Sequence, residues 1–114
     1  MEFLALIHAD ENGWERLSDE ERQAVYQRYM DFSERGEIVG GAELQSTTAA
    51  TTVRLRDGDR LVTDGPYAEV KEALGGFFIL ECDSIDEACK LAAEIPAAEH
   101  GAIEVRPVYV REEN

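Results

Sequence analysis

The sequence predicts one α+β domain built from two β-α-β units with a hairpin inserted between them. Two capping boxes, each a serine followed three residues later by a glutamate, mark the starts of two helices. Apolar, strand-like runs stand before and after each helix. Between the two units, an Asp-Gly turn at residues 57–58 separates two further strand-like runs, which indicates a hairpin. The length of 114 residues fits a single domain covering residues 1–114.

The first unit ends near residue 44. Its expected elements are a strand at residues 2–8, a polar loop at 9–17, a helix at 18–35 and a strand at 37–44. Residues 2–8 are apolar on both faces up to His8, so we expect both faces to be covered. Ser18 supplies the N-cap of the helix, and Gly36 ends it. The pair Gly40-Gly41 inside a strand is typical of a bulge or of a close backbone approach.

The second unit follows the hairpin. The remaining expected elements are hairpin strands at 51–56 and 60–63, a loop at 64–76, a strand at 77–82, a helix from the Ser84 capping box to Pro96, and a strand at 103–110. In the last strand, Ile103, Val105 and Tyr109 share one face. Glu104 and Arg106 lie on the other. Two such units make a ferredoxin-like βαββαβ sandwich, in which both helices cover one face of a four-stranded antiparallel sheet.

A ferredoxin-like sandwich leaves the second face of its sheet open. Because the runs at 2–8 and 77–82 are apolar on both faces, we expect this face to be buried as well. A second copy of the chain is one cover, since homodimers dominate soluble oligomers, and two facing sheets would form a dimeric α/β barrel. The loop at 64–76 of the same chain is the alternative cover.

The composition narrows the range of partners. The net charge is −14, from 11 basic and 25 acidic residues, so we expect no nucleic acid and no anionic membrane as partner. No signal peptide or apolar membrane span is apparent, which predicts a cytoplasmic protein. Cys82 and Cys89 match no metal or redox spacing and are expected to be small core residues. The sequence predicts no metal site and no cofactor.

Three separated motifs resemble one known family. They are the stretch from Asp64-Gly65-Pro66-Tyr67 through Gly75-Gly76-Phe77, the triplet Thr52-Val53-Arg54, and the run His100–Pro107. Together these motifs resemble the YCII-related proteins of the DGPF type, with Tyr67 where the family name records Phe. The resemblance implies a ferredoxin-like fold, a dimeric α/β barrel and a bacterial origin. It also implies frequent proximity to genes of extracytoplasmic-function sigma factors.

The same resemblance bears on catalysis. An enzymatic role has been proposed for the broader YCII group because a His and an Asp meet in a cleft. Asp64 is the residue that matches this Asp. The helix-borne His of the family has no counterpart in residues 22–35, so His8 or His100 would have to take its place.

Six residues are candidates for a site. His8 would act as general base, and Asp64 would fix its tautomer. Both residues also have a structural interpretation, His8 as a core histidine and Asp64 as a turn residue. Arg106 would clamp a carboxylate or phosphate, or else form an ion pair within the sheet. The other expected ligand-binding residues are Glu104, which shares the face of Arg106, and Tyr67 and Glu69 in the loop. The charged residues of that loop are also consistent with a solvated helical turn, a lid or a dimer contact.

Two functions are consistent with these residues. The first is a small enzyme with an acid–base site in a barrel cleft that acts on a small polar metabolite. The second is a non-catalytic small-molecule-binding or regulatory dimer linked to the sigma-factor or stress response, in which the same loop seals the interface or holds an effector. Fold alone does not separate them.

Overall fold

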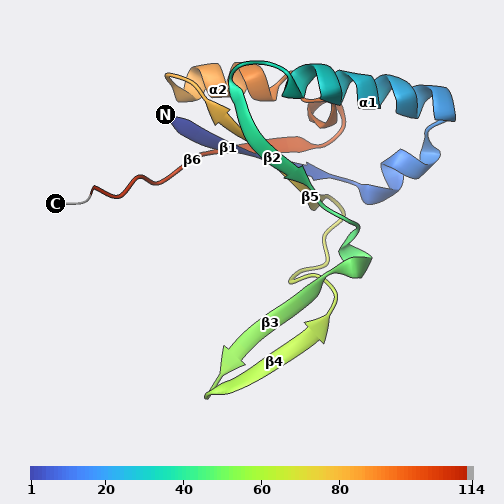
Figure 1. The fold of residues 1–114 in the computed structure, drawn as a ribbon. Coiled ribbons are helices and arrows are strands. Elements are labelled where there is room, and N and C mark those ends of the chain that lie inside the picture. Colours follow the sequence, from blue (N-terminus) through green and yellow to red (C-terminus); the bar gives the residue numbers. More distant parts are fainter. Residues whose placement is uncertain (113–114) are drawn as a thin grey trace.

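The protein has an α+β architecture in a computed structural model that describes residues 1–112 (Figure 1). Its strands are β1 (Glu2–Ala9), β2 (Ile38–Glu43), β3 (Thr51–Arg56), β4 (Asp59–Asp64), β5 (Ala73–Glu81) and β6 (Ala102–Pro107). Its helices are α1 (Asp19–Ser33) and α2 (Ile85–Ala92), with short 3₁₀ helices η1 (Glu11–Arg16), η2 (Thr47–Ala49) and η3 (Pro96–Glu99).

Four strands form the main sheet in the order β2-β5-β1-β6, and every neighbouring pair is antiparallel. Both α-helices lie on the same side of this sheet (Figure 1). The order and the shared helix face are compatible with the ferredoxin-like fold that the sequence predicts. The strands β3 and β4 form a separate two-stranded sheet.

The core fills the space between this sheet and the helices. Its buried members come from both layers: Phe3, Ala5, Phe32, Leu80, Ala88, Leu91, Ala92, Ile95 and Ala97. Phe3 and Leu80 face each other across β1 and β5 and are almost fully buried. From α1, Phe32 meets the ring of Phe78 edge-on at 5.0 Å between centroids, an arrangement that aromatic pairs prefer.

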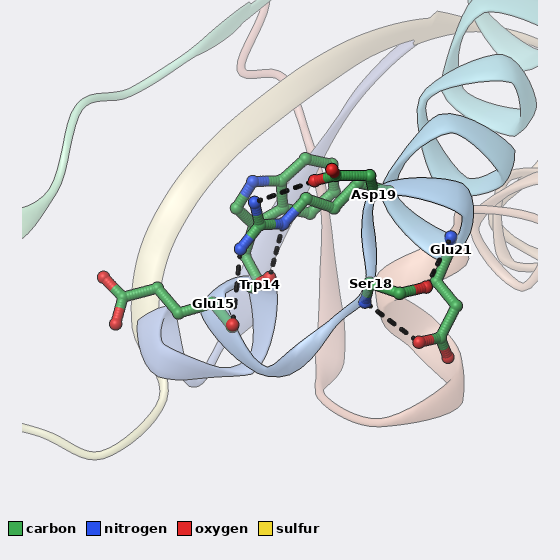
Figure 2. Close-up of polar contacts among 6 residues, drawn as sticks. Trp14, Glu15, Ser18, Asp19 and Glu21 are labelled. Carbon is green, nitrogen blue, oxygen red and sulfur yellow. Dashed lines mark hydrogen bonds and ion pairs between the residues drawn. The ribbon is translucent and has the colours of Figure 1, made fainter.

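The N-terminus of α1 is held as predicted. Ser18 Oγ accepts from the Glu21 backbone N–H at 3.1 Å, and the Glu21 carboxylate accepts from the Ser18 N–H at 3.0 Å (Figure 2). This second bond lowers the pKa of Glu21. The expected polar loop at 9–17 instead contains η1, whose Trp14 lies beneath the guanidinium of Arg22. Arg22 also donates to the Trp14 carbonyl at 3.1 Å, which ties η1 to α1.

The start of α2 differs from the prediction in one bond. Ser84 Oγ accepts from the Glu87 N–H at 3.2 Å, but the Glu87 carboxylate accepts from the Asp83 N–H rather than from Ser84. The second capping box is therefore only half formed. The helix also ends at Ala92, and Pro96 begins η3 instead of closing α2, because proline suits the first turn of a helix.

The start of β5 and the end of β6 differ from the predicted residues, because backbone pairing determines where a strand begins and ends. β5 begins at Ala73 rather than Phe77, since Ala9 of β1 is still available as its partner. β6 ends at Pro107. Directly after it, the Val108 N–H donates a backbone hydrogen bond to the carbonyl of Glu2, where β1 begins. Tyr109 consequently lies beyond the strand and is 82% exposed, so it does not share a strand face with Ile103 and Val105 as expected.

The hairpin turn and the bulge that the glycines predict are both present. The hairpin turn at Asp57-Gly58 has positive φ at both residues, and the bulge appears as a register shift near Gly40.

Cys82 packs partly against the core, and burial raises the pKa of its thiol. Cys89 is exposed on α2, so its expected place in the core is wrong.

Candidate functional site

One histidine–carboxylate pair lies on the face of the sheet opposite the helices. His8 Nε2 and Glu104 Oε1 are 3.2 Å apart, with the side chains 31% and 53% exposed. The two residues come from neighbouring strands: His8 stands opposite Ala102, and Glu104 stands opposite Leu6. Strand alternation therefore brings both side chains to one face in adjacent rows.

The backbone around His8 is closely packed. β5 carries one extra residue, Gly75, between the partners of Ile7 and His8, so the β1–β5 register shifts at this step. Bulges of this kind redirect nearby side chains and are common beside functional sites. Gly101 approaches the His8 carbonyl so closely that a Cβ at position 101 would collide with it. A glycine is therefore required where β6 meets β1 beside the pair.

Arg106 completes a polar row along β6. It stands opposite Leu4, two residues beyond Glu104, and so shares the face of the His8–Glu104 pair. Arg106 is exposed, and within residues 1–112 it forms no ion pair, neither with Glu104 nor with Asp64 or Glu69. Its guanidinium is thus free to meet a carboxylate or phosphate on this side of the sheet.

The other three predicted site residues lie elsewhere in the chain. Asp64 is exposed and stands opposite Thr51 at the end of β4, so the carboxylate bonded to His8 is Glu104 and not Asp64. Tyr67 is 80% exposed and stacks near Arg54, whose guanidinium carbon is 5.8 Å from the ring centre. Glu69 is exposed in a segment that forms no helical turn.

A small cavity opens where β1 ends. It measures about 320 Å³ and lies between η1 and the last part of the 64–76 loop, lined by Asp10, Glu11, Asn12, Val70, Lys71 and Ala73. Glu11 is held in place from η2, because its carboxylate accepts from the Thr47 N–H at 2.7 Å and the Thr47 hydroxyl at 2.9 Å. These two bonds lower the pKa of Glu11. Lys71 supplies the positive charge of the cavity.

Sequence reasoning found neither the Glu11 anchor nor the cavity. The expected 9–17 loop gave no hint of η1, and Thr47 lies 36 residues away from Glu11. The pairing of His8 with Glu104 had a usable signal. In a ferredoxin-like sheet the first and last strands are neighbours, so alternating positions on residues 2–8 and 103–110 meet on one face.

Residues 1–112 contain no cluster of three or more His, Cys, Asp or Glu side chains that could hold a metal ion. Neither α1 nor α2 has the length and apolar character that crossing a membrane requires.

The fold and this side-chain arrangement define a small α+β protein with a histidine–carboxylate pair on the open face of its sheet. The chain belongs to the YCII-related family, whose domain matches residues 1–112. It is 37% identical over 117 residues to an uncharacterised protein of Rhizobium meliloti (strain 1021), a match that covers 95% of this chain and 92% of that protein. The family resemblance seen in the sequence motifs is thereby confirmed.

Proposed function

We propose that the chain is a small acid–base enzyme in which His8 removes a proton from a small polar metabolite. The observation that supports this most directly is the 3.2 Å contact between His8 Nε2 and Glu104 Oε1 on an accessible face. A carboxylate that accepts from one ring nitrogen fixes the tautomer and stabilises the imidazolium formed when the ring takes a proton. Glu104 therefore takes the positioning role that the sequence suggested for Asp64.

The substrate should carry an anionic group. Arg106 lies on the same face as the pair and can hold a carboxylate or phosphate in two parallel hydrogen bonds. Acidic groups dominate the rest of the chain, whose net charge is −14, so an arginine that forms no ion pair within residues 1–112 is a distinctive anchor on this face. The proposed chemistry is proton abstraction from an anionic metabolite that Arg106 orients over His8.

The proposed site is completed in a homodimer. Leu4, Leu6, Phe77 and Ile79 share the face of the pair and remain partly exposed, outside the core cluster. The loop at 67–72 is exposed and leaves this face open, which favours a second copy over the loop as its cover. Two such faces packed together as a dimeric α/β barrel would exclude water from the pair and strengthen its electrostatic effect. Asp64, Tyr67 and Glu69 enter the proposed site only through the partner copy.

A ligand screen tests the pair. Thermal melts of the wild type, His8→Gln and Glu104→Gln against small carboxylates and phosphates should find compounds that stabilise the wild type. A ligand at 100 times its Kd stabilises by about 2.7 kcal/mol, which corresponds to roughly 10 °C for a domain of this size. We expect this shift to be lost in both variants and kept in the control His100→Gln, since His100 is exposed beyond η3. Equal shifts in His8→Gln and wild type would exclude the pair as the binding site.

Catalysis is tested separately from binding. Each stabilising compound is incubated in deuterated buffer with wild-type protein, and NMR follows deuterium uptake at carbon or conversion to product. Proton abstraction by His8 predicts exchange that His8→Gln abolishes. Stabilisation without exchange or conversion would instead support the non-catalytic ligand-binding or regulatory dimer, and the catalytic proposal would then be withdrawn.

A further inference from the structure

We propose that the β3–β4 hairpin, here called the arm (residues 51–64), is a clasp that packs against a second copy of this chain. This proposal rests on the homodimer proposed above and adds a second contact to it. The arm stands away from the main sheet and the helices (Figure 1). Every residue of β4 is exposed, as are four of the six residues of β3. A two-stranded hairpin by itself is only marginally stable in water, so an arm of this kind needs something to pack on.

One face of the arm carries a cluster of three apolar side chains, beside Arg60, which stands opposite Leu55. Val53 and Val62 are directly opposite each other in the β3–β4 ladder, and Leu55 lies two residues further along the same face. These three side chains are 61%, 56% and 68% exposed. Adjacent apolar side chains with this exposure, on an element that contributes nothing to the core, mark an interaction surface.

The charge distribution identifies the partner. Three arginines and three aspartates leave the arm neutral, so the remaining 100 residues carry the whole net charge of −14. Within residues 1–112, none of the arm arginines, Arg54, Arg56 and Arg60, forms an ion pair. A neutral arm with free arginines can approach a strongly acidic surface that would repel most other parts of the chain. The body of a second copy is such a surface.

The exposed area supports the same partner. The protein exposes 8597 Å², whereas a compact monomer of 12.7 kDa would expose roughly 6,200 Å². Its radius of gyration is 16.5 Å, against about 13 Å for a compact chain of this length. The excess of about 2,400 Å² is in the range that one subunit buries in obligate dimers, about 1,000–2,500 Å².

The sheet face alone is too small to account for this excess. Four strands about 4.8 Å apart and about six residues long span roughly 400 Å² of projected sheet. The excess accessible area is larger than this projected area, which favours a dimer that buries the arm as well as the sheet face. The geometry therefore points to a dimer with two kinds of contact, the facing sheets and an arm from each copy laid on its partner.

Paired aspartate substitutions test the clasp. The arm variant is Val53→Asp/Val62→Asp, and the matched control is Tyr109→Asp/Val110→Asp, which places the same charge at residues 82% and 78% exposed beyond β6. Sedimentation equilibrium measures the dimer Kd, and far-UV circular dichroism checks that each variant is folded. We expect the arm variant to weaken the dimer by about 100-fold or more, because two apolar contacts are lost and two charges are buried. The control should stay within about threefold of wild type.

Hydrogen exchange provides a second measurement that needs no variant. Amides of β3 and β4 should be protected at concentrations where wild type is dimeric and should lose that protection on dilution. A folded arm variant with wild-type Kd, or arm amides that stay unprotected in the dimer, would overturn the clasp and leave the sheet-to-sheet dimer in place. A wild type that is monomeric throughout would overturn both the clasp and the dimer, while the ligand screen would still test the His8–Glu104 pair.

Discussion

Glu11 offers a sharp test of how this fold is held together. Its carboxylate on η1 accepts from the Thr47 N–H at 2.7 Å, from the Thr47 hydroxyl at 2.9 Å and from the Ser46 hydroxyl at 3.3 Å. These bonds connect the end of β1 with η2, the turn through which the chain enters the arm. Replacing Glu11 by glutamine preserves the shape of the side chain, removes the charge and leaves one acceptor oxygen.

The size of the effect follows from the bonds that weaken. Hydrogen bonds to charged groups contribute about 1.5–3 kcal/mol and neutral ones about 1 kcal/mol, and partial exposure of Glu11 reduces the difference. We therefore expect Glu11→Gln to lower the free energy of unfolding by about 1–2 kcal/mol at pH 7. For 114 residues this corresponds to a fall in Tm of about 4–8 °C.

The effect should depend on pH in one direction. The hydrogen bonds from Thr47 lower the pKa of Glu11 below its ordinary value of 4.5, so the folded state favours the carboxylate. A lowered folded-state pKa gives stability that is complete above the unfolded value and is lost as the pH falls through the folded value. The Tm gap between wild type and Glu11→Gln should therefore be full at pH 7 and should close below pH 4.5.

Calorimetric melts of both proteins from pH 7 down to pH 3 measure this gap. Glu15→Gln is the control, because Glu15 lies in the same η1 helix with an exposed side chain. Its Tm should stay close to wild type at each pH. If the two variants melt together, or if the Glu11→Gln gap is the same at pH 7 and pH 3, the anchoring role of this carboxylate is refuted.

Three further substitutions probe other parts of the chain. Leu80 is fully buried, so Leu80→Ala should lower the free energy of unfolding, measured in urea, by about 2–5 kcal/mol. The side chain of Leu44 is 43% exposed, so a comparable loss in Leu44→Ala would contradict the assigned core. The ion pair of Arg28 with Glu99 spans 2.7 Å between side chains that are 50% and 60% exposed. Arg28→Ala should therefore change stability by less than about 1 kcal/mol, and a larger loss would show that this pair is not merely a surface contact. Gly58 has a φ of 82°, so Gly58→Ala should strain the turn by about 1–2 kcal/mol. This strain should speed amide exchange in β3 and β4 about 5–30-fold, and unchanged exchange would argue against a strained turn.

Local chemistry made much of the fold predictable. Ser18 and Glu21 hold each other through bonds three residues apart, and Asp57-Gly58 turns the chain within two residues. Such signals lie within a few residues in the sequence and depend little on distant packing. The order of apolar runs and helices likewise predicted which strands form the main sheet, because two β-α-β units assemble into one four-stranded sheet.

Long-range pairing explains what the sequence did not reveal. The start of β5 depends on the length of β1 that remains free to pair with it, and the location of the Glu11 carboxylate depends on Thr47. The exposure of Cys89, by contrast, follows from local helical spacing, because Ala88 and Ala92 take the buried positions of α2. The candidate site shows the same limit, since His8 meets the carboxylate of the neighbouring strand and not that of the signature loop.

The contact between Trp14 and Arg22 determines what an optical experiment on this protein will measure. Trp14 is the only tryptophan in the chain, and it is 46% exposed beneath a guanidinium 5.8 Å from its ring centre. Its emission therefore reports the separation of η1 from α1 more directly than the loss of the buried core. A fluorescence melt that precedes the loss of helical ellipticity would record detachment of this N-terminal junction, and tryptophan emission alone would underestimate the global stability of the protein.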